Sequence, residues 1–417
     1  FKGCNNLNIY YQVFSVINEK GRIVISHGFS ECIEKYNELI YYFTEMGYSV
    51  YAIEHRGHGR SGSFGKKHKS QISIDKFEYY VEDLRIFLDT IVVGKDVDLY
   101  LYAHSMGGAI GTMFLEKYCG YFKKAILSAP MMDINTGEYH KAISYLISQI
   151  YINIGKGEEF LFGQGPFEGK YDLESSGTSN MYRYKNHLDY LNKNEELQRC
   201  GGSFKWLNES LKATKEILKK RNIEKINIPI LFFQAGRDTF VKEKGQNKFC
   251  EIANMCKKIR FENGKHELYM EDDEIMIEYL KNISEYLVLW AVGGCIYYGI
   301  EVLFRGFSHI SMFMLGGLCM QFFTWQGRLT EWQDVLPRQI TRCTIFVVSM
   351  EFITGIIVNK WYHLAVWDYS DMPLQLCGQI CLPFALIFSF LCTIGIILSG
   401  YLLHWFYREP LPHYRIW

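Results

Sequence analysis

The sequence lacks the patterns that mark several large classes of protein. It contains no G-x-x-x-x-G-K-[ST] string, so the chain cannot itself be a P-loop ATPase. Its twelve cysteines are spread singly, without CxxC pairs or His/Cys clusters at metal-ligand spacing, which favours free thiols in a reducing compartment and predicts no metal site. Lys plus Arg and Asp plus Glu number 45 each, without a block of like charge, so nucleic acid is not an expected partner.

Apolar residues are abundant, but they are unevenly distributed along the 417 residues. Up to about Leu287 the sequence is mixed and rich in lysine. Residues 288–417 are apolar and aromatic and hold only seven charged residues of each sign. We therefore predict two domains, residues 1–287 and residues 288–417.

Strand-like and helix-like patterns alternate through residues 1–287. The strand-like runs are 8–14, 22–26, 48–53, 97–103, 124–130, 228–234 and 258–261. Such alternation predicts an α/β fold with a mostly parallel sheet covered by helices on both faces. Residues 131–205, rich in Tyr, Gly, Ser and Asn, interrupt the alternation, and we expect them to form a cap insertion over the sheet.

Ser105 is the candidate nucleophile. It stands between a predicted strand and a predicted helix, flanked by Ala103, Gly107 and Gly108. Small residues allow the sharp turn of a nucleophile elbow, which exposes the serine hydroxyl above the sheet. The usual pattern is G-x-S-x-G, so Ala103 replaces the first glycine.

A serine hydroxyl needs a base, and the base needs a carboxylate to orient it. Asp238 and His266 follow two later strands, in the chain order serine, acid, histidine that this arrangement takes. Backbone N–H groups of Phe29 and Met106 are the candidate oxyanion donors. Alone, each piece has a simpler explanation, since a G-x-S-x-G-like string arises by chance and a single Asp or His after a strand is usually a turn residue or helix cap. Their joint occurrence in this order favours a catalytic triad.

Several separated motifs in residues 1–287 resemble the monoacylglycerol lipase and bacterial lysophospholipase branch of the α/β-hydrolases. The motifs are residues 56–61, 103–110, 128–131, 201–206 and 265–268. The resemblance implies Ser105 as nucleophile, Asp238 as acid, His266 as base, and Phe29 and Met106 as oxyanion donors. It also implies a monoacyl lipid substrate and no cofactor. Besides Ala103, the chain departs from the family pattern at Glu54, where aspartate is usual, and neither departure removes a catalytic group.

Aromatic residues of the cap insertion could line an apolar slot for one acyl chain, although aromatics there are as often core. The candidates are Tyr145, Tyr151, Phe160, Phe162 and Phe167.

Four apolar stretches follow, beginning at residue 286, and each is about as long as a bilayer core is thick. They are residues 286–304, 310–326, 340–358 and 380–406. Buried core helices are the alternative, but four in succession with so few charges favour an all-α membrane bundle of about four spans. If the hydrolase domain is cytoplasmic, four spans place the loop 327–339 inside, and Arg328, Arg338 and Arg342 lie in or beside it. We therefore predict a multi-pass protein of the cell membrane with a cytoplasmic hydrolase domain.

Ionisable residues in or beside these stretches are candidate functional groups, because charge is costly within a membrane. Glu301 and Arg305 are one helical turn apart, His309 lies beyond them, and Glu351 lies in the third stretch. An ion pair that only holds the bundle together is at least as good an explanation. Short strings in this part are similar to the membrane family labelled "Putative ABC-transporter type IV", a label that implies little mechanism. The strings are residues 301–306, 308–309, 314–317, 351–355 and 367–370.

The leading hypothesis is a membrane-attached serine ester hydrolase that cleaves lysophospholipids or monoacylglycerols through an acyl-enzyme. Its partners are then a monoacyl lipid and membrane lipid. The alternative, from a different class, is a multi-span transport or assembly component with a fused or regulatory hydrolase domain, whose membrane-protein partner the sequence does not identify.

Overall fold

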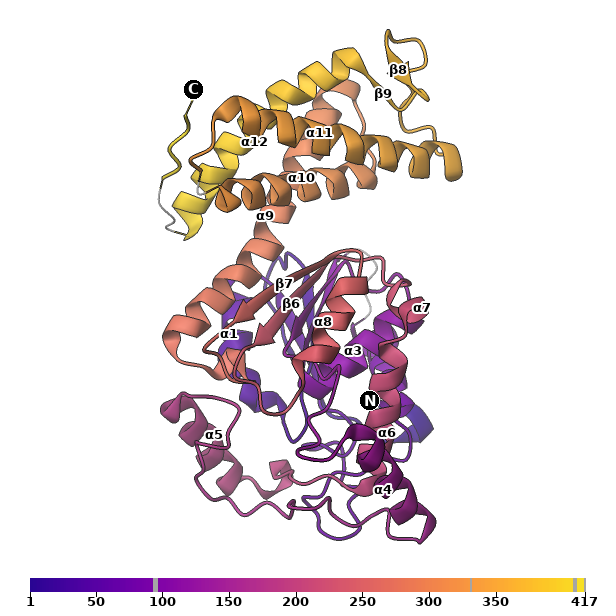
Figure 1. Cartoon of the computed structure of the whole chain (residues 1–417), viewed down its shortest axis with the longest axis vertical. Helices are drawn as coiled ribbons and strands as arrows, with labels where there is room; N and C mark the ends of the chain where they lie inside the picture. Colours follow the sequence, from indigo (N-terminus) through magenta and orange to yellow (C-terminus); the bar gives the residue numbers. More distant parts are fainter. Residues whose placement is uncertain (93–96, 331, 408–410, 416–417) are drawn as a thin grey trace. The chain divides into compact units, whose positions relative to one another are not determined.

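The computed structural model describes residues 1–92, 97–330, 332–407 and 411–415. Its chain divides into two compact units, Phe1–Tyr279 and Leu280–Trp417 (Figure 1). Each unit is described separately.

The first unit is built on a seven-stranded sheet in the order β1-β3-β2-β4-β5-β6-β7. Every neighbouring pair is parallel except β1 and β3, which are antiparallel. The strands are β1 (Tyr11–Phe14), β2 (Arg22–Ser26), β3 (Ser49–Ile53), β4 (Leu99–His104), β5 (Lys124–Ser128), β6 (Ile230–Ala235) and β7 (Cys256–Phe261). The predicted α/β fold with a mostly parallel sheet is confirmed.

Helices cover both faces of this sheet, as the alternation of side chains along β4 shows. Leu101 and Ala103 belong to one buried cluster with residues of α2 (Glu78–Phe87), α3 (Ser105–Lys117) and α6 (Phe204–Ile217). Tyr102 points to the other face, where its ring contacts Phe43 of α1 (Asn37–Glu45) and its hydroxyl bonds that of Tyr279 in α9 (Asp273–Arg305). Both sides of the sheet are therefore dry, which explains why the inner strands have continuous apolar sequences.

The remaining helices of this unit connect the strands or form the insertion after β5. The connecting elements are η1 (Cys4–Asn6), η2 (Ile33–Tyr36), η3 (Leu88–Val92), α7 (Lys220–Ile223), α8 (Glu243–Ile252) and η5 (Leu268–Met270). The insertion holds α4 (Lys141–Asn153), α5 (Met181–Lys193) and η4 (Glu195–Leu197). Figure 1 shows α4 and α5 away from the sheet, on the side toward which the β6 and β7 arrows point. Ser203 ends the insertion by capping α6, since its hydroxyl accepts the Trp206 N–H at 3.1 Å.

The second unit is mainly helical. It contains most of α9, then α10 (Ile310–Leu329), α11 (Leu336–Gly355), η6 (Ile356–Trp361) and α12 (Leu382–Tyr407). Helices α10, α11 and α12 lie side by side around one buried cluster (Figure 1). A two-stranded antiparallel sheet, β8 (Gln375–Leu376) with β9 (Ile380–Cys381), precedes α12. The prediction of an all-α bundle was therefore wrong in this detail.

Within the described residues three helices, not the four expected, are long and apolar enough to cross a membrane. They are Asp273–Arg305, Leu336–Trp361 and Leu382–Trp405. The expected second span does form a helix, α10, but Gln321, Gln326 and Arg328 keep its hydropathy below that of the three candidate spans. The four-span topology loses its basis, because an odd number of spans would put the two ends of the unit on opposite sides.

Candidate active site

Ser105 lies at the turn between β4 and α3. Its φ is +52°, a left-handed value that is strained for a residue with a side chain, as a nucleophile elbow requires. The turn is tight because α3 packs closely behind it: a Cβ at Gly107 would overlap the carbonyl oxygens of Ser26 and His27 at the end of β2. The strand and the glycine together force the Ser105 hydroxyl outward.

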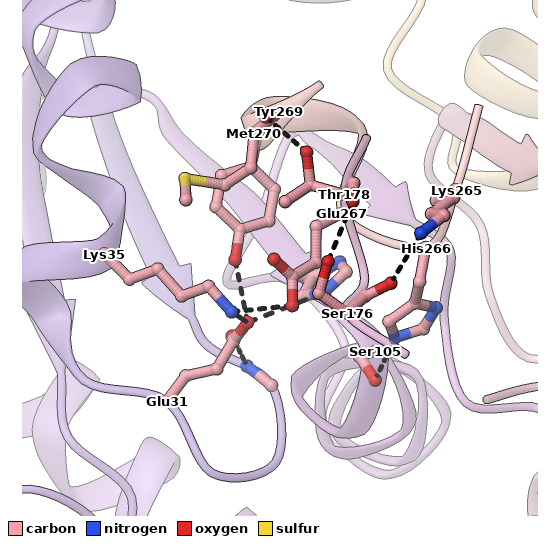
Figure 2. Close-up of polar contacts among 12 residues, drawn as sticks. Glu31, Lys35, Ser105, Ser176, Thr178, Lys265, His266, Glu267, Tyr269 and Met270 are labelled. Carbon is pink, nitrogen blue, oxygen red and sulfur yellow. Dashed lines mark hydrogen bonds and ion pairs between the residues drawn. The ribbon is translucent and has the colours of Figure 1, made fainter. Parts of the chain in front are cut away.

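The structure brings Ser105, His266 and Asp238 into one hydrogen-bonded line. His266 Nε2 lies 2.7 Å from Ser105 Oγ (Figure 2). On the other side of the ring, His266 Nδ1 lies 2.7 Å from Asp238 Oδ2. Asp238 follows β6 and His266 follows β7, so adjacent parallel strands deliver the acid and the base to the same sheet edge. The other Asp238 oxygen accepts the N–H groups of Phe240 and Val241 at 2.8 and 3.0 Å, which fixes the carboxylate.

The electrostatics of this line suit a base held by an ionised acid. Burial alone would lower the pKa of His266, but the nearby Asp238 carboxylate outweighs burial and the pKa is raised, with Glu267 and Glu31 adding in the same direction. Burial would raise the pKa of Asp238, and the His266 contact together with the two N–H donors instead keeps it below the usual value.

The two candidate oxyanion donors come from neighbouring strands. Strand β2 pairs in parallel with β4, so the loop with Phe29 and the turn before Met106 emerge at one sheet edge. Met106 is the second residue of α3, and N–H groups in the first turn of a helix have no partner within it. The Phe29 ring packs on Trp206, with ring centres 4.1 Å apart, which anchors the loop beneath the returning cap segment.

Three charged residues that were not among the predicted site residues lie beside the triad. Lys35 Nζ is 2.9 Å from Glu31 Oε1 and 2.7 Å from Glu267 Oε1, and all three side chains are largely buried (Figure 2). Glu31 and Lys35 stand four residues apart, a spacing at which ion pairs often form. Glu267 directly follows His266, and nothing in the sequence places it against Lys35.

The loop that carries His266 is also bonded to the cap insertion. Lys265 Nζ donates to the carbonyl oxygens of Leu173, Glu174 and Ser176 at 3.1, 3.0 and 3.3 Å. Glu267 N–H donates to Gly177 O at 2.7 Å, and Thr178 Oγ1 donates to Met270 O at 2.6 Å (Figure 2). The base therefore sits on a loop held between the sheet and the insertion.

The aromatic residues predicted to line one acyl slot do not form a single cluster. Tyr151 and Phe162 pack against Phe204 of α6, whereas Phe167 packs near Cys32 and Leu197. Tyr145 and Phe162 are exposed, and Phe160 bridges to the backbone of Ser203. Their role in substrate binding stays a prediction.

The candidate residues of the second unit form separate groups. Glu301 pairs with Arg305 at 3.0 Å and accepts the Ser308 hydroxyl at 2.8 Å. His309 caps α10, with its Nδ1 accepting the Ser311 N–H. Glu351 is 2% exposed, and its Oε1 accepts the Tyr369 hydroxyl at 3.3 Å. Its Oε2 has no hydrogen-bond partner among the described residues.

Neither unit offers an obvious metal site. Across residues 1–92, 97–330, 332–407 and 411–415, no group of three or more His, Cys, Asp or Glu side chains is arranged to hold an ion.

Comparison with known protein families gives two matches that divide the chain. Residues 17–273 match the family described as "Serine aminopeptidase, S33", and residues 283–414 match "Putative ABC-transporter type IV".

Among individual proteins, the chain is 30% identical to the probable lysophospholipase L2 of Haemophilus influenzae over 269 residues, which cover 64% of this chain and 83% of that protein. It is 25% identical to mouse (Mus musculus) monoglyceride lipase over 282 residues, 66% of this chain and 86% of the relative. The crystal structure of the Paleococcus ferrophilus monoacylglycerol lipase matches with a TM-score of 0.54 at 18% identity, over 68% of this chain and 99% of that one, a similarity of fold.

Proposed function

The chain belongs to the α/β-hydrolase family described as "Serine aminopeptidase, S33", which includes serine esterases. We propose that it hydrolyses the ester bond of a monoacyl lipid. A domain of the "Putative ABC-transporter type IV" family follows the hydrolase. The observation that carries the proposal is the unbroken line of hydrogen bonds from Ser105 through His266 to Asp238.

The proposed reaction begins when His266 Nε2 takes the proton of Ser105 Oγ, which attacks the ester carbonyl carbon. The negative charge on the carbonyl oxygen is stabilised by the N–H groups of Phe29 and Met106. The tetrahedral intermediate then releases the glycerol-type alcohol, which takes the proton from His266, and leaves the acyl group on Ser105. Water, deprotonated by His266, cleaves that acyl-enzyme and frees the fatty acid. Asp238 keeps the imidazole in the right tautomer and stabilises its charged form.

The substrate class is inferred from the relatives, whose names describe lysophospholipases and monoglyceride lipases. Both kinds of substrate carry one acyl chain on a glycerol-based headgroup. Helices able to cross a membrane, attached to the hydrolase, would keep it beside such lipids. We propose that these helices hold the protein in the cell membrane. The cytoplasmic placement of the hydrolase unit was predicted from four spans and is not carried over to three.

The test uses the full chain in membranes. A fluorophosphonate probe, which reacts with activated serines, should label the wild-type protein in the membrane pellet and not the Ser105→Ala variant. Fatty acid release from lysophosphatidylcholine and from monooleoylglycerol should fall at least about 10⁴-fold in that variant. The faster of the two reactions shows whether the enzyme prefers a phospholipid or a plain glycerol headgroup. Undiminished hydrolysis by Ser105→Ala would overturn the proposal.

A second candidate function rests on the second unit, where the buried Oε2 of Glu351 lacks a partner among the described residues. Polar groups inside a membrane bundle are often functional, so this unit could be a transport or assembly component with the hydrolase fused to it. The same Ser105→Ala variant separates the two ideas. The transport or assembly role is favoured if a cellular phenotype of deleting the protein is rescued by the Ser105→Ala variant but not by Glu351→Ala.

A further inference from the structure

Glu31 occupies an unusual place for a carboxylate, since it is 3% exposed and surrounded by hydrogen-bond donors. Its Oε2 accepts the N–H of Gly28 and the hydroxyl of Tyr36, both at 2.5 Å. Its Oε1 accepts the Tyr269 hydroxyl at 2.7 Å and pairs with Lys35 (Figure 2). Four donors on one carboxylate leave it little freedom to move.

Two of these donors, Gly28 and Tyr269, come from the two loops that the proposed reaction uses, and the other two, Lys35 and Tyr36, lie in η2. Gly28 directly precedes Phe29, the candidate oxyanion donor, so the Glu31 carboxylate fixes the peptide next to that N–H. Tyr269 lies three residues after His266 in the loop of the base. A single side chain therefore ties the oxyanion loop to the base loop.

Lys35 makes this arrangement possible in a buried place. Its ammonium lies between Glu31 and Glu267, at 2.9 and 2.7 Å, so it pairs with a carboxylate from each loop. An unpaired charge here would be strongly unfavourable, and removing one member of such a group leaves the others uncompensated. Burial raises the pKa of the Glu31 carboxyl, but the Lys35 ammonium, helped by the hydrogen bond from Tyr36, outweighs burial and holds that pKa well below its usual range, so Glu31 is a carboxylate at neutral pH.

His104 separates this charge from the triad. It precedes Ser105, its ring lies 4.8 Å from that of His266, and its Nδ1 lies 3.0 Å from Ser128 O. Burial lowers the pKa of His104 to about 3, so it stays neutral. Glu31 therefore does not exchange protons with His266. Its charge adds to the raised pKa of His266, and its hydrogen bonds fix the position of the two loops.

We propose that Glu31 is a positioning residue for the hydrolase reaction, which holds the Phe29 N–H and the His266 loop in one fixed arrangement, with Lys35 as its counter-ion. The proposal rests on the proposed function. Oxyanion donors stabilise the transition state much more than the bound substrate, so loss of Glu31 should lower kcat and leave KM nearly unchanged.

The main test compares Glu31→Gln with Asp83→Asn in the full chain. Asp83 is a matched control, because it is also buried, accepts a backbone N–H (from Cys4, 2.7 Å) and pairs with an arginine (Arg56, 2.6 Å), but lies on α2 outside the site. With p-nitrophenyl butyrate as substrate, we expect Glu31→Gln to lower kcat by about 10- to 100-fold, with KM within about 3-fold of wild type. Asp83→Asn should lower Tm without this loss of kcat.

A milder variant covers the case in which Glu31→Gln does not fold. Tyr269→Phe removes one donor and keeps the carboxylate, and we expect kcat about 3- to 10-fold lower with KM unchanged. The rate at which the fluorophosphonate labels Ser105 should also fall, more in Glu31→Gln than in Tyr269→Phe.

The outcomes separate this inference from the proposed function. A kcat within two-fold of wild type in Tyr269→Phe and in folded Glu31→Gln, or an equal loss in Asp83→Asn, overturns the positioning role while the hydrolase activity stands. A wild-type chain that turns over no ester and is not labelled at Ser105 overturns both.

Discussion

Both units bury an apolar core, but they differ in how many large apolar side chains their surfaces expose. In the first unit Ile23, Leu101 and Phe232 are fully buried in the sheet. In the second, Phe390, Leu386 and other large apolar residues of the helices are more than 60% exposed. Water drives apolar groups inward, whereas helices in lipid can present them outward, so the exposed apolar surface of the second unit suits a membrane.

Most buried polar side chains are hydrogen-bonded in both units, so the units differ mainly in their exposed apolar residues. Glu31 is enclosed by donors in the first unit. In the second, Asn359 donates to Trp367 O and Gln379 Oε1, at 3.0 and 2.7 Å, and accepts the Val366 N–H at 2.7 Å. Both interiors satisfy most of their polar atoms, and only the outer surfaces differ.

The largest expected effect isolates the chemistry in the first unit. Asp238→Asn should keep the side-chain shape but favour the wrong His266 tautomer, so kcat on p-nitrophenyl butyrate should fall by about 10⁴-fold. Membrane sedimentation of the full chain should not change, because Asp238 lies in the sheet unit. A loss of less than ten-fold would contradict the assigned role of this carboxylate.

A smaller effect tests the outward apolar surface directly. Phe390→Asp places a charge on the exposed side of α12, and insertion of the α12 segment into microsomal membranes should become less favourable by about 2.5–3.5 kcal/mol. The control is Ile17→Asp, since Ile17 is 91% exposed in the first unit. We expect it to change the free energy of unfolding by no more than about 0.5 kcal/mol. If the wild-type and Phe390→Asp α12 segments insert equally well, the contrast between the two units is removed.

The smallest effect concerns pH. His266 must be neutral to act as base, and its pKa is raised above the usual value of about 6.5, so kcat/KM should fall as pH drops through a pKa above that value. A pH–rate profile of the wild-type chain measures this midpoint. A midpoint below pH 6.5 would mean that Asp238 does not dominate the environment of His266.

The positions of Ser105, Asp238 and His266 could be predicted because each follows a strand, and parallel strands end at one edge. The Lys35–Glu267 pair could not, because 232 residues separate its members and only the folded loops bring them together. The second unit was harder to predict. Strands β8 and β9 have two residues each, too short for a periodic pattern, and α10 has the length of a span without the hydropathy.

Gly111, one helical turn beyond the elbow glycines in α3, explains why the elbow accepts alanine at position 103. A Cβ at Gly111 would lie 3.1 Å from Ala103 Cβ and 2.9 Å from Leu101 Cδ2, so methyl groups at both positions would crowd this space. Positions 103 and 111 should therefore covary in evolution. Homologues that carry glycine at the first position can accept alanine at the second, whereas alanine at both should be rare.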